Sequence, residues 1–361
     1  MKIERVHFYC SHAAKTKDWF VRNIGFRAIG NWIDAHTHTE LIALNSAYFL
    51  ISSPLTKASP IAAYLARHPT GVGDISFRVQ NLSAIVERSR RLGLKVLQNI
   101  QVKQSPRGRF LTAQITGWND LLHTLIEAED DNCDCFNARM ESESELNTSA
   151  SQITGIDHIV LNVARGKLGL AVELYQKLFN FHVQQSFEIK TSASGLTSQA
   201  LIDETGQVQF NINQPSGDNS QIQEFINFNR GSGIQHLALR SQNLIADMTR
   251  LQSGELEFLA VPPAYYRNLN ASTYLSDFEQ QTVAQQQILV DRDRDYPQSL
   301  LMQIFTQPIF EQPTFFLEFI ERRQSAKGFG RGNFQALFEA VERQSEHRLS
   351  LPIEDKKTVH S

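Results

Sequence analysis

The stretch Gly155-Ile-Asp-His158-Ile-Val-Leu-Asn-Val163 opens a pattern that the chain repeats. The run is short and mostly apolar, as a β-strand is, and the residues after it have the apolar spacing of a helix that stops near Asn180. A further strand-like run, Val208-Gln-Phe-Asn-Ile, comes next. Three other parts of the chain open in the same way: residues 3–9, 71–79 and 233–241.

Each of these four stretches begins a unit of one strand, one helix and further strands, and internal repeats of this kind indicate a repeated module. The sequence therefore predicts an α+β protein with four such modules. Because 361 residues are too many for one ordinary core, we expect the modules to pair into two domains. An acidic segment rich in Ser and Asn would join the pairs. We place the first domain at residues 1–135, the linker at 136–152, the second domain at 153–345 and a tail at 346–361.

The first strands of the four modules can be aligned, and the aligned position holds His7, Asp74, His158 and His236. If two modules pack about a pseudo-twofold axis, equivalent positions face each other, so His158 and His236 should point into one cavity. A third group, Glu318, lies in an aromatic strand-like run of the fourth module. A carboxylate on an inward face is costly unless it meets a cation or a metal. The first pair of modules offers no comparable carboxylate, so we expect no working site there.

Two imidazoles and one carboxylate on one side of a metal ion form the facial triad of non-heme iron(II) oxygenases. Three protein donors leave positions of an octahedral ion open for a 2-oxo acid and for dioxygen, whereas zinc in a closed tetrahedral site would leave none. The predicted metal ligands are therefore His158, His236 and Glu318, and the predicted cofactor is Fe(II). The run His36-Thr-His38-Thr-Glu40 also looks metal-like, but one strand cannot surround an ion, and a solvated strand face explains it better.

Side-chain alternation along the strands identifies further residues of the same cavity. Residues two apart share a face, and those predicted to line the cavity are Asn162 with His158, Phe316 with Glu318, Gln303 with Phe305, and Asn211 with Asn213. The phenylalanines would flank the metal and the amides would lie further out. Aromatic walls suit a flat ring, and the amides could bind a polar group on that ring.

Composition and charge argue against several classes of function. Hydrophobic residues make up 41% of the chain and charged residues 20%, which is ordinary for a soluble globular protein. A net charge of -3 gives no reason to expect nucleic acid or an anionic membrane as partner. No apolar run approaches the length of a membrane span, and the first residues lack the apolar core of a signal peptide. The cysteines (Cys10, Cys133 and Cys135) make no disulfide framework, so we expect a cytoplasmic protein.

Six motifs of the chain occur in one order. They are Gly155-Ile-Asp-His158-Ile-Val, Ser220-Gln-Ile-Gln-Glu-Phe, Gly233-Ile-Gln-His236-Leu-Ala-Leu, Leu301-Met-Gln-Ile-Phe-Thr-Gln-Pro, Pro313-Thr-Phe-Phe-Leu-Glu318 and Gly328-Phe-Gly-Arg-Gly-Asn-Phe334. Together they closely resemble the 4-hydroxyphenylpyruvate dioxygenase family. The match is dense over residues 155–343 and looser over the N-terminal half. One departure is Asn211, where the family usually has proline, and another is a lengthened segment at residues 323–328.

The resemblance implies a vicinal-oxygen-chelate fold, with four βαβββ modules in two open-barrel domains and iron in the C-terminal barrel. It implies the same three metal ligands. The catalytic residues on the polar side would be Ser198, Asn213, Gln235 and Gln303. The substrate-binding residues would be Gln221, Phe305, Phe316, Phe329, Asn333 and Phe334, with Asn333 in a C-terminal gate formed by residues 332–344. Gln235 should face away from His236 on a regular strand, so its place in the pocket is implied by the resemblance alone.

The reaction implied by the resemblance converts 4-hydroxyphenylpyruvate and dioxygen to homogentisate and carbon dioxide, as in tyrosine catabolism and aromatic amino acid metabolism. The 2-oxo acid would be part of the substrate itself. We expect a homo-oligomer, either a dimer or a tetramer. Three alternatives stay open: 4-hydroxymandelate synthase, an extradiol catechol dioxygenase, and a non-catalytic binding module on this fold.

Overall fold

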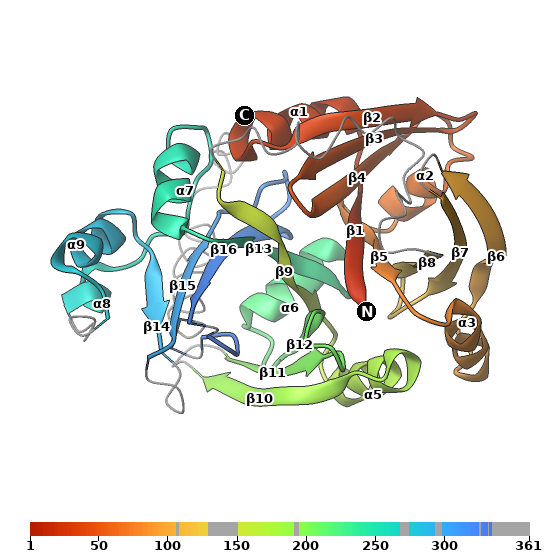
Figure 1. Ribbon diagram of the computed structural model, residues 1–361. Coiled ribbons are helices and arrows are strands. Elements are labelled where there is room, and N and C mark those ends of the chain that lie inside the picture. The colour runs from red at the N-terminus through yellow and green to blue at the C-terminus, as the bar shows by residue number, and fades with distance from the viewer. Residues whose placement is uncertain are drawn as a thin grey trace.

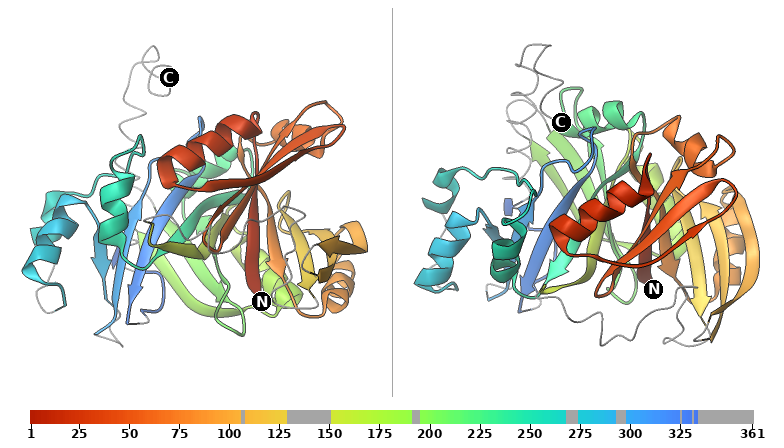
Figure 2. Two further views of the ribbon diagram at one scale, coloured as in Figure 1. Left: turned by 45° about the horizontal axis from the view of Figure 1, so that its top comes forward. Right: turned by 90° about the horizontal axis from the view of Figure 1, so that it is seen from above.

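The computed structural model describes residues 1–105, 108–128, 151–190, 195–267, 274–292, 298–324, 326–330 and 332–333. These residues form two curled eight-stranded sheets, one from each half of the chain (Figures 1 and 2). In this part of the chain, no helix is both long enough and apolar enough to cross a membrane.

The first sheet has the strand order β2-β3-β4-β1-β5-β8-β7-β6. Its elements are β1 (Lys2–Tyr9), α1 (Ala13–Ile24), β2 (Arg27–Ile33), β3 (Thr37–Leu44), β4 (Ala47–Pro54), α2 (Pro60–Leu65), β5 (Gly71–Arg78), α3 (Leu82–Arg91), β6 (Val96–Ser105), β7 (Gly108–Thr116) and β8 (Leu122–Ala128). The two central strands β1 and β5 run antiparallel, and each has a parallel partner on its other side, β4 and β8 respectively.

The second sheet has the order β10-β11-β12-β9-β13-β16-β15-β14, which is the order of the first sheet strand for strand. Its elements are β9 (Ile153–Asn162), α5 (Leu168–Phe179), β10 (His182–Lys190), β11 (Gly195–Ile202), β12 (Gln209–Pro215), α6 (Gln221–Asn229), β13 (Gly233–Ser241), α7 (Leu244–Leu251), α8 (Pro263–Arg267), α9 (Asp277–Gln285), β14 (Leu289–Asp291), β15 (Leu300–Phe305) and β16 (Phe316–Arg323). The predicted α+β class and the four βαβββ modules in two open barrels are confirmed.

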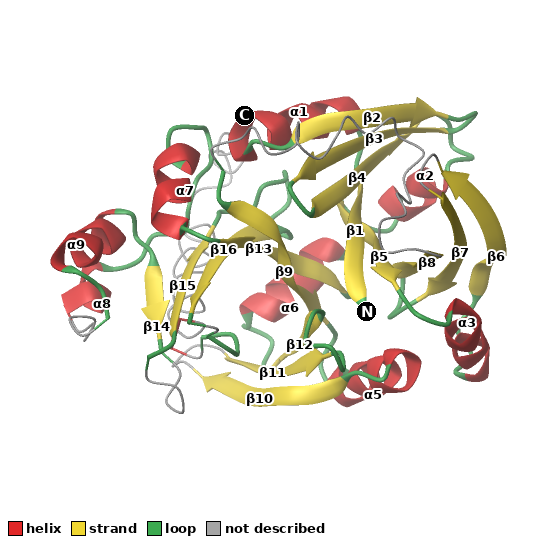
Figure 3. Ribbon diagram, viewed as in Figure 1, coloured by secondary structure: helices red, strands yellow, loops and turns green. Residues whose placement is uncertain are grey.

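Helices α1, α3, α5 and α7 lie on the outer sides of the curled sheets (Figure 3). Each follows the first strand of a module, as the apolar spacing predicted. Side chains cap two of them at equivalent places: Asn81 accepts a hydrogen bond from Ala84 N at 3.1 Å, and Asn243 accepts one from Ala246 N at 3.0 Å. An Asx cap of this kind satisfies an N–H group that has no partner within the helix.

The two halves share one continuous apolar core. The ring of Phe8 on β1 lies 5.2 Å from that of Phe315, and the ring of Phe77 on β5 lies 5.1 Å from that of Phe179 at the end of α5. The two sheets therefore bury apolar surface against each other. The domain boundaries stay a prediction, because residues 129–150, which hold most of the expected linker together with Cys133 and Cys135, lie outside the described residues, as does the tail.

Helix α1 ends at a glycine whose backbone is left-handed. Gly25 has a φ of +92°, and a Cβ atom added there would lie 2.9 Å from Arg250 Nη1, which donates to Ile24 O at 2.6 Å. We expect Gly25→Ala to lower the free energy of unfolding by about 1–2 kcal/mol, because an L-residue in this region is strained. Urea unfolding measures the change.

The matched control is Gly169→Ala in α5, where an added Cβ meets no atom within 4 Å. That variant should be as stable as the parent protein or slightly more stable, because alanine favours a helix over glycine. Equal loss of stability in the two variants would contradict the strain at Gly25.

Candidate metal centre

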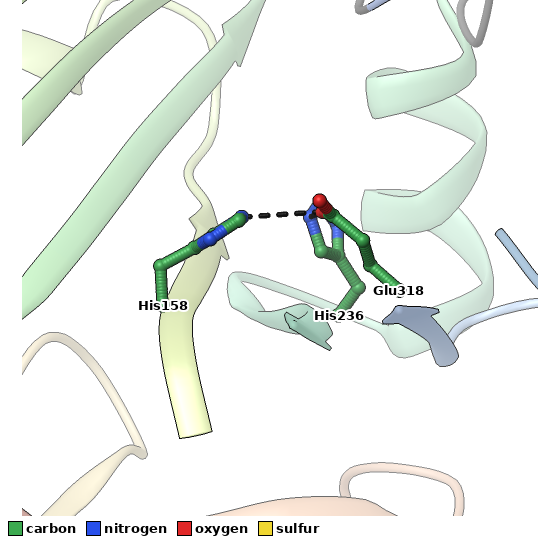
Figure 4. Close-up of side chains that lie close together, drawn as sticks. All are labelled: His158, His236 and Glu318. Atoms are coloured by element: carbon green, nitrogen blue, oxygen red, sulfur yellow. Dashed lines mark ion pairs between the residues drawn. The ribbon is translucent and has the colours of Figure 1, made fainter. Parts of the chain in front are cut away.

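Three buried side chains from neighbouring strands meet inside the second sheet. His158 comes from β9, His236 from β13 and Glu318 from β16, and each is at most 2% exposed. Glu318 Oε2 lies 3.2 Å from His158 Nε2 and 3.5 Å from His236 Nε2. Figure 4 shows the three side chains pointing toward one another. The structure therefore brings together the three residues that we predicted as metal ligands.

Strand register explains how they meet. His158 pairs with Ala238 across β9 and β13, and Ala238 pairs with Glu318 across β13 and β16. These three residues form one row across the sheet, and the small side chain of Ala238 leaves room between the other two. His236 lies two residues before Ala238 and so presents its ring on the same face.

The donor set fits a metal ion. One ligand atom from each residue lies within 4.8 Å of the other two. Donors about 2.0–2.2 Å from an ion lie about 3 Å apart when they share a face of an octahedron, and the two contacts of Glu318 are close to that separation. Within the described chain this is the one such cluster of His, Cys, Asp and Glu. It leaves the opposite side of an ion free of protein donors from this set.

The charges of the cluster also favour a cation. Burial alone would lower the pKa of His158, but Glu318 and Asp157 raise it to about 9. Burial alone would raise the pKa of Glu318, but the two imidazoles lower it to about 2. Burial lowers the pKa of His236 below its ordinary value. The carboxylate thus stabilises positive charge beside it, and a bound metal ion would supply that charge while both imidazoles stay neutral.

Asp157 holds the first of these histidines in place, and the sequence analysis missed it. Its carboxylate is fully buried and accepts a hydrogen bond from His158 Nδ1 at 3.0 Å. It also accepts from Arg240 Nε at 2.9 Å and from Arg322 Nε and Nη2 at 2.9 and 2.7 Å. These bonds fix the tautomer in which His158 Nε2 is free to bind a metal. The available signal was an Asp within an apolar strand, with Arg on the neighbouring strand β13 and on the strand beyond it, β16.

Arg322 extends this network toward the C-terminus. Its Nη1 donates to the carbonyls of Ala326 and Gly328 at 3.1 and 2.7 Å. The next residue, Phe329, is 3% exposed and packs edge-on against His158 with ring centroids 5.0 Å apart. The lengthened segment at residues 323–328 is therefore linked to His158 in two ways, through Arg322 and Asp157 and through the ring of Phe329.

Gln303 joins Glu318 to the same C-terminal segment. Its Nε2 donates to Glu318 Oε1 at 2.8 Å, and its Oε1 accepts from Asn333 Nδ2 at 2.8 Å. Asn333 is fully buried and also accepts from the Tyr265 hydroxyl at 3.0 Å. The predicted gate residue Phe334 and residues 334–344 of the predicted gate lie outside the described residues.

An aromatic wall stands beside the histidines. Phe316 stacks on His236 with ring centroids 4.6 Å apart, and Phe305 lies edge-on to Phe316 at 6.3 Å. Both rings are nearly buried and pack with Leu259 and Leu289. The structure therefore brings Phe305 and Phe316 together beside His236, and their role in substrate binding stays a prediction.

A set of buried amides lies on β9 and β12. Asn213 Nδ2 donates to Asn162 Oδ1 at 3.3 Å, and Ser198 on β11 pairs with Asn213 in register. Several polar atoms here have no hydrogen-bond partner among the described residues: Asn162 Nδ2, Ser198 Oγ, both amide atoms of Asn211, and Asn213 Oδ1. Buried polar groups nearly always have a partner, so this set is suited to binding a polar ligand.

The two remaining predicted residues share one hollow. Gln221 and Gln235 line this hollow of about 30 Å3, with Phe316 also in its wall. The pairing of β13 with β9 shifts register at Gln235, so the alternation of a regular strand does not apply there. The role of both amides in substrate binding stays a prediction.

Comparisons with known proteins agree with this geometry. Residues 155–280 match the family model described as "Glyoxalase/Bleomycin resistance protein/Dioxygenase superfamily". The chain is 34% identical to an uncharacterized protein of Synechocystis, covering 98% of this chain and 100% of that protein. It is 31% identical to the 4-hydroxyphenylpyruvate dioxygenase of Dictyostelium discoideum, covering 96% of this chain and 99% of that protein.

A solved structure has the same fold. A mutant of 4-hydroxymandelate synthase from Streptomyces coelicolor superposes with a TM-score of 0.83 at 22% identity, covering 95% of this chain and 98% of that one. Together with the superfamily model, this confirms the predicted vicinal-oxygen-chelate fold.

The buried carboxylate behind His158 gives a prediction. We expect Asp157→Asn to weaken metal binding by about 10- to 100-fold, because the amide orients the imidazole less firmly and removes negative charge. Titration of the metal-free protein with Co(II), followed by its visible spectrum, measures the affinity.

The control is Asp247→Asn, which changes another buried carboxylate, one that accepts from Ser241 Oγ at 2.6 Å. It should leave Co(II) affinity unchanged even if it lowers stability. Equal Co(II) affinity in Asp157→Asn and the parent protein would show that Asp157 has no part in metal binding.

Proposed function

The chain belongs to the 4-hydroxyphenylpyruvate dioxygenase family of non-heme iron dioxygenases, and we propose that it converts 4-hydroxyphenylpyruvate and dioxygen to homogentisate and carbon dioxide. The family resemblance and the enzyme class predicted from the sequence are confirmed. The observation that carries the proposal is the buried set of His158, His236 and Glu318 beside an aromatic wall.

In this proposal the three side chains hold Fe(II). When bound, the ion would supply open coordination positions for the 2-oxo acid and dioxygen, and it would relay electrons from the substrate to dioxygen. The three donors come from one side, which leaves the substrate-facing side open. Asp157 keeps His158 in the metal-binding tautomer, and Gln303 donates to the Glu318 oxygen that lies away from the histidines.

The chain itself would bind and orient the aromatic ring. Phe305 and Phe316 offer an apolar wall for the flat ring. Asn213, Asn211 and Ser198 present buried polar atoms that could take the phenol hydroxyl. Because these side chains are nearly fully buried, the site excludes water from the reacting groups.

Homogentisate is proposed over 4-hydroxymandelate because several curated relatives bear the name 4-hydroxyphenylpyruvate dioxygenase, whereas the similarity to 4-hydroxymandelate synthase shows only the fold. Ring placement by Phe305 would decide between the two products. A homo-oligomer and a cytoplasmic location stay predictions from the sequence.

The first prediction concerns the product. After anaerobic reconstitution with Fe(II), the enzyme should release one carbon dioxide per 4-hydroxyphenylpyruvate when dioxygen is admitted, with homogentisate as the aromatic product. Homogentisate and 4-hydroxymandelate are isomers, so mass alone does not separate them. NMR of the product resolves the ring substitution, and 4-hydroxymandelate as the main product would overturn the proposal.

The second prediction concerns the carboxylate ligand. Glu318→Gln should abolish detectable turnover and weaken Co(II) binding more than 100-fold, because a neutral amide replaces the anionic donor. The matched control is Glu321→Gln on the same strand, whose carboxylate accepts from Leu244 N at 2.6 Å at the start of α7. That control should keep Co(II) affinity. Retained Co(II) binding by Glu318→Gln would argue against this ligand set.

A further inference from the structure

The first sheet encloses a cavity that the proposed reaction does not use. Its volume is about 590 Å3, which lies within the range of about 300–1,000 Å3 typical of small-molecule sites. Every strand from β1 to β8 contributes to its wall, so it is the interior of the first open barrel. Within the described residues, no Asp or Glu lines it.

Strand pairing shows which residues of this barrel correspond to the metal centre of the other. Arg5 pairs with Ser76, and Ser76 pairs with Thr124, on the strands equivalent to β9, β13 and β16. This row occupies the place of His158, Ala238 and Glu318. All three of its side chains line the cavity.

An ion pair outside the cavity fixes the same correspondence. Glu4 pairs with Arg78 at 2.7 Å, as Asp157 pairs with Arg240 at 2.9 Å. The residue after each acid is Arg5 in one half and His158 in the other. The alignment of His7 with His158 in the sequence analysis is therefore wrong by two residues. The pairing Arg5–Ser76 and His7–Asp74 in one half matches His158–Ala238 and Val160–His236 in the other, so His7 corresponds to Val160.

The different residues in the two rows reverse the charge of the ligand that each barrel favours. The second half presents imidazoles and a carboxylate, which suit a cation, whereas the first half presents the guanidinium of Arg5 with Ser76 and Thr124, whose hydroxyls donate to Asp74. Lys103 adds a second positive charge to the lining, and Trp32, whose side chain is 46% exposed, also lines the cavity. Guanidinium groups bind carboxylates through charge-assisted hydrogen bonds.

Among the described residues, the acid that lies behind this row is Asp74, which is 1% exposed and does not line the cavity. Its carboxylate already accepts from Thr124 Oγ1 and Gln114 Nε2, both at 2.8 Å, and from Thr124 N at 3.2 Å. His7 adds no charge, because burial and Arg5 lower its pKa to about 3.

Apolar side chains complete the wall. Leu41, Leu50 and Phe110 are buried, and Trp32 stands at the rim. We propose that this cavity is a second binding site, for an aromatic monocarboxylate whose carboxylate contacts Arg5 and whose ring lies against these apolar residues. The site is separate from the metal centre, so its occupation does not depend on the proposed reaction.

Phenylacetate is the probe that tests the proposal, with calorimetry on the metal-free protein as the measurement. Arg5→Gln should lower its affinity at least tenfold, and Lys103→Gln, at an exposed position, should lower it several-fold. Arg165→Gln removes an equal charge at an exposed site away from the cavity and should leave affinity unchanged. Phenylacetamide, the neutral analogue, should bind at least tenfold more weakly than phenylacetate.

Fluorescence locates the bound ligand. Phenylacetate should change the emission of Trp32, and Trp32→Phe should remove that change. A loss of affinity in Phe316→Ala with none in Arg5→Gln and Lys103→Gln would place the ligand in the second barrel and overturn the proposal. Failure of phenylacetate to bind at millimolar concentration would overturn it as well.

Discussion

The buried carboxylate of Glu318 is the constraint on which the second half of the molecule depends. A charge at 1% exposure is stable only if opposite charge and hydrogen bonds compensate the lost water. His158, His236 and Gln303 provide this compensation, but each must come from a different strand and therefore requires the register of β9, β13, β15 and β16. A slip by one residue would turn all of these side chains to the other face.

The compensation continues outward as a chain of alternating charge. His158 donates a hydrogen bond to Asp157, and the carboxylate of Asp157 pairs with Arg322 and Arg240. The side chain of Arg240 is 46% exposed. The network thus runs from the centre of the barrel to solvent. Because Arg322 also binds the carbonyls of residues 326 and 328, the position of the C-terminal segment and the orientation of a metal ligand depend on the same guanidinium.

The repeated sequence predicted the four modules, the two barrels and the three residues that meet at Glu318. Local pattern sufficed there because alternation and helical spacing are properties of single elements. It did not suffice for His7, because matching histidine to histidine ignored the strand pairing, which makes Arg5 the residue equivalent to His158. Local pattern also failed to find Asp157, because this residue acts by pairing with arginines on other strands. The sequence of one strand does not show such pairs.

The two halves show which positions of this fold can change freely. At the outer positions, Glu127 accepts from Leu82 N at 2.8 Å as Glu321 accepts from Leu244 N at 2.6 Å, and each of these contacts joins a strand to the start of a helix. The same contact at the helix start is therefore made in both halves. Among the described residues, the two rows of paired residues inside the barrels, Arg5–Ser76–Thr124 and His158–Ala238–Glu318, make no such contact with a helix. Their residues differ, and the difference decides whether a barrel attracts an anion, through Arg5, or a cation, through Glu318.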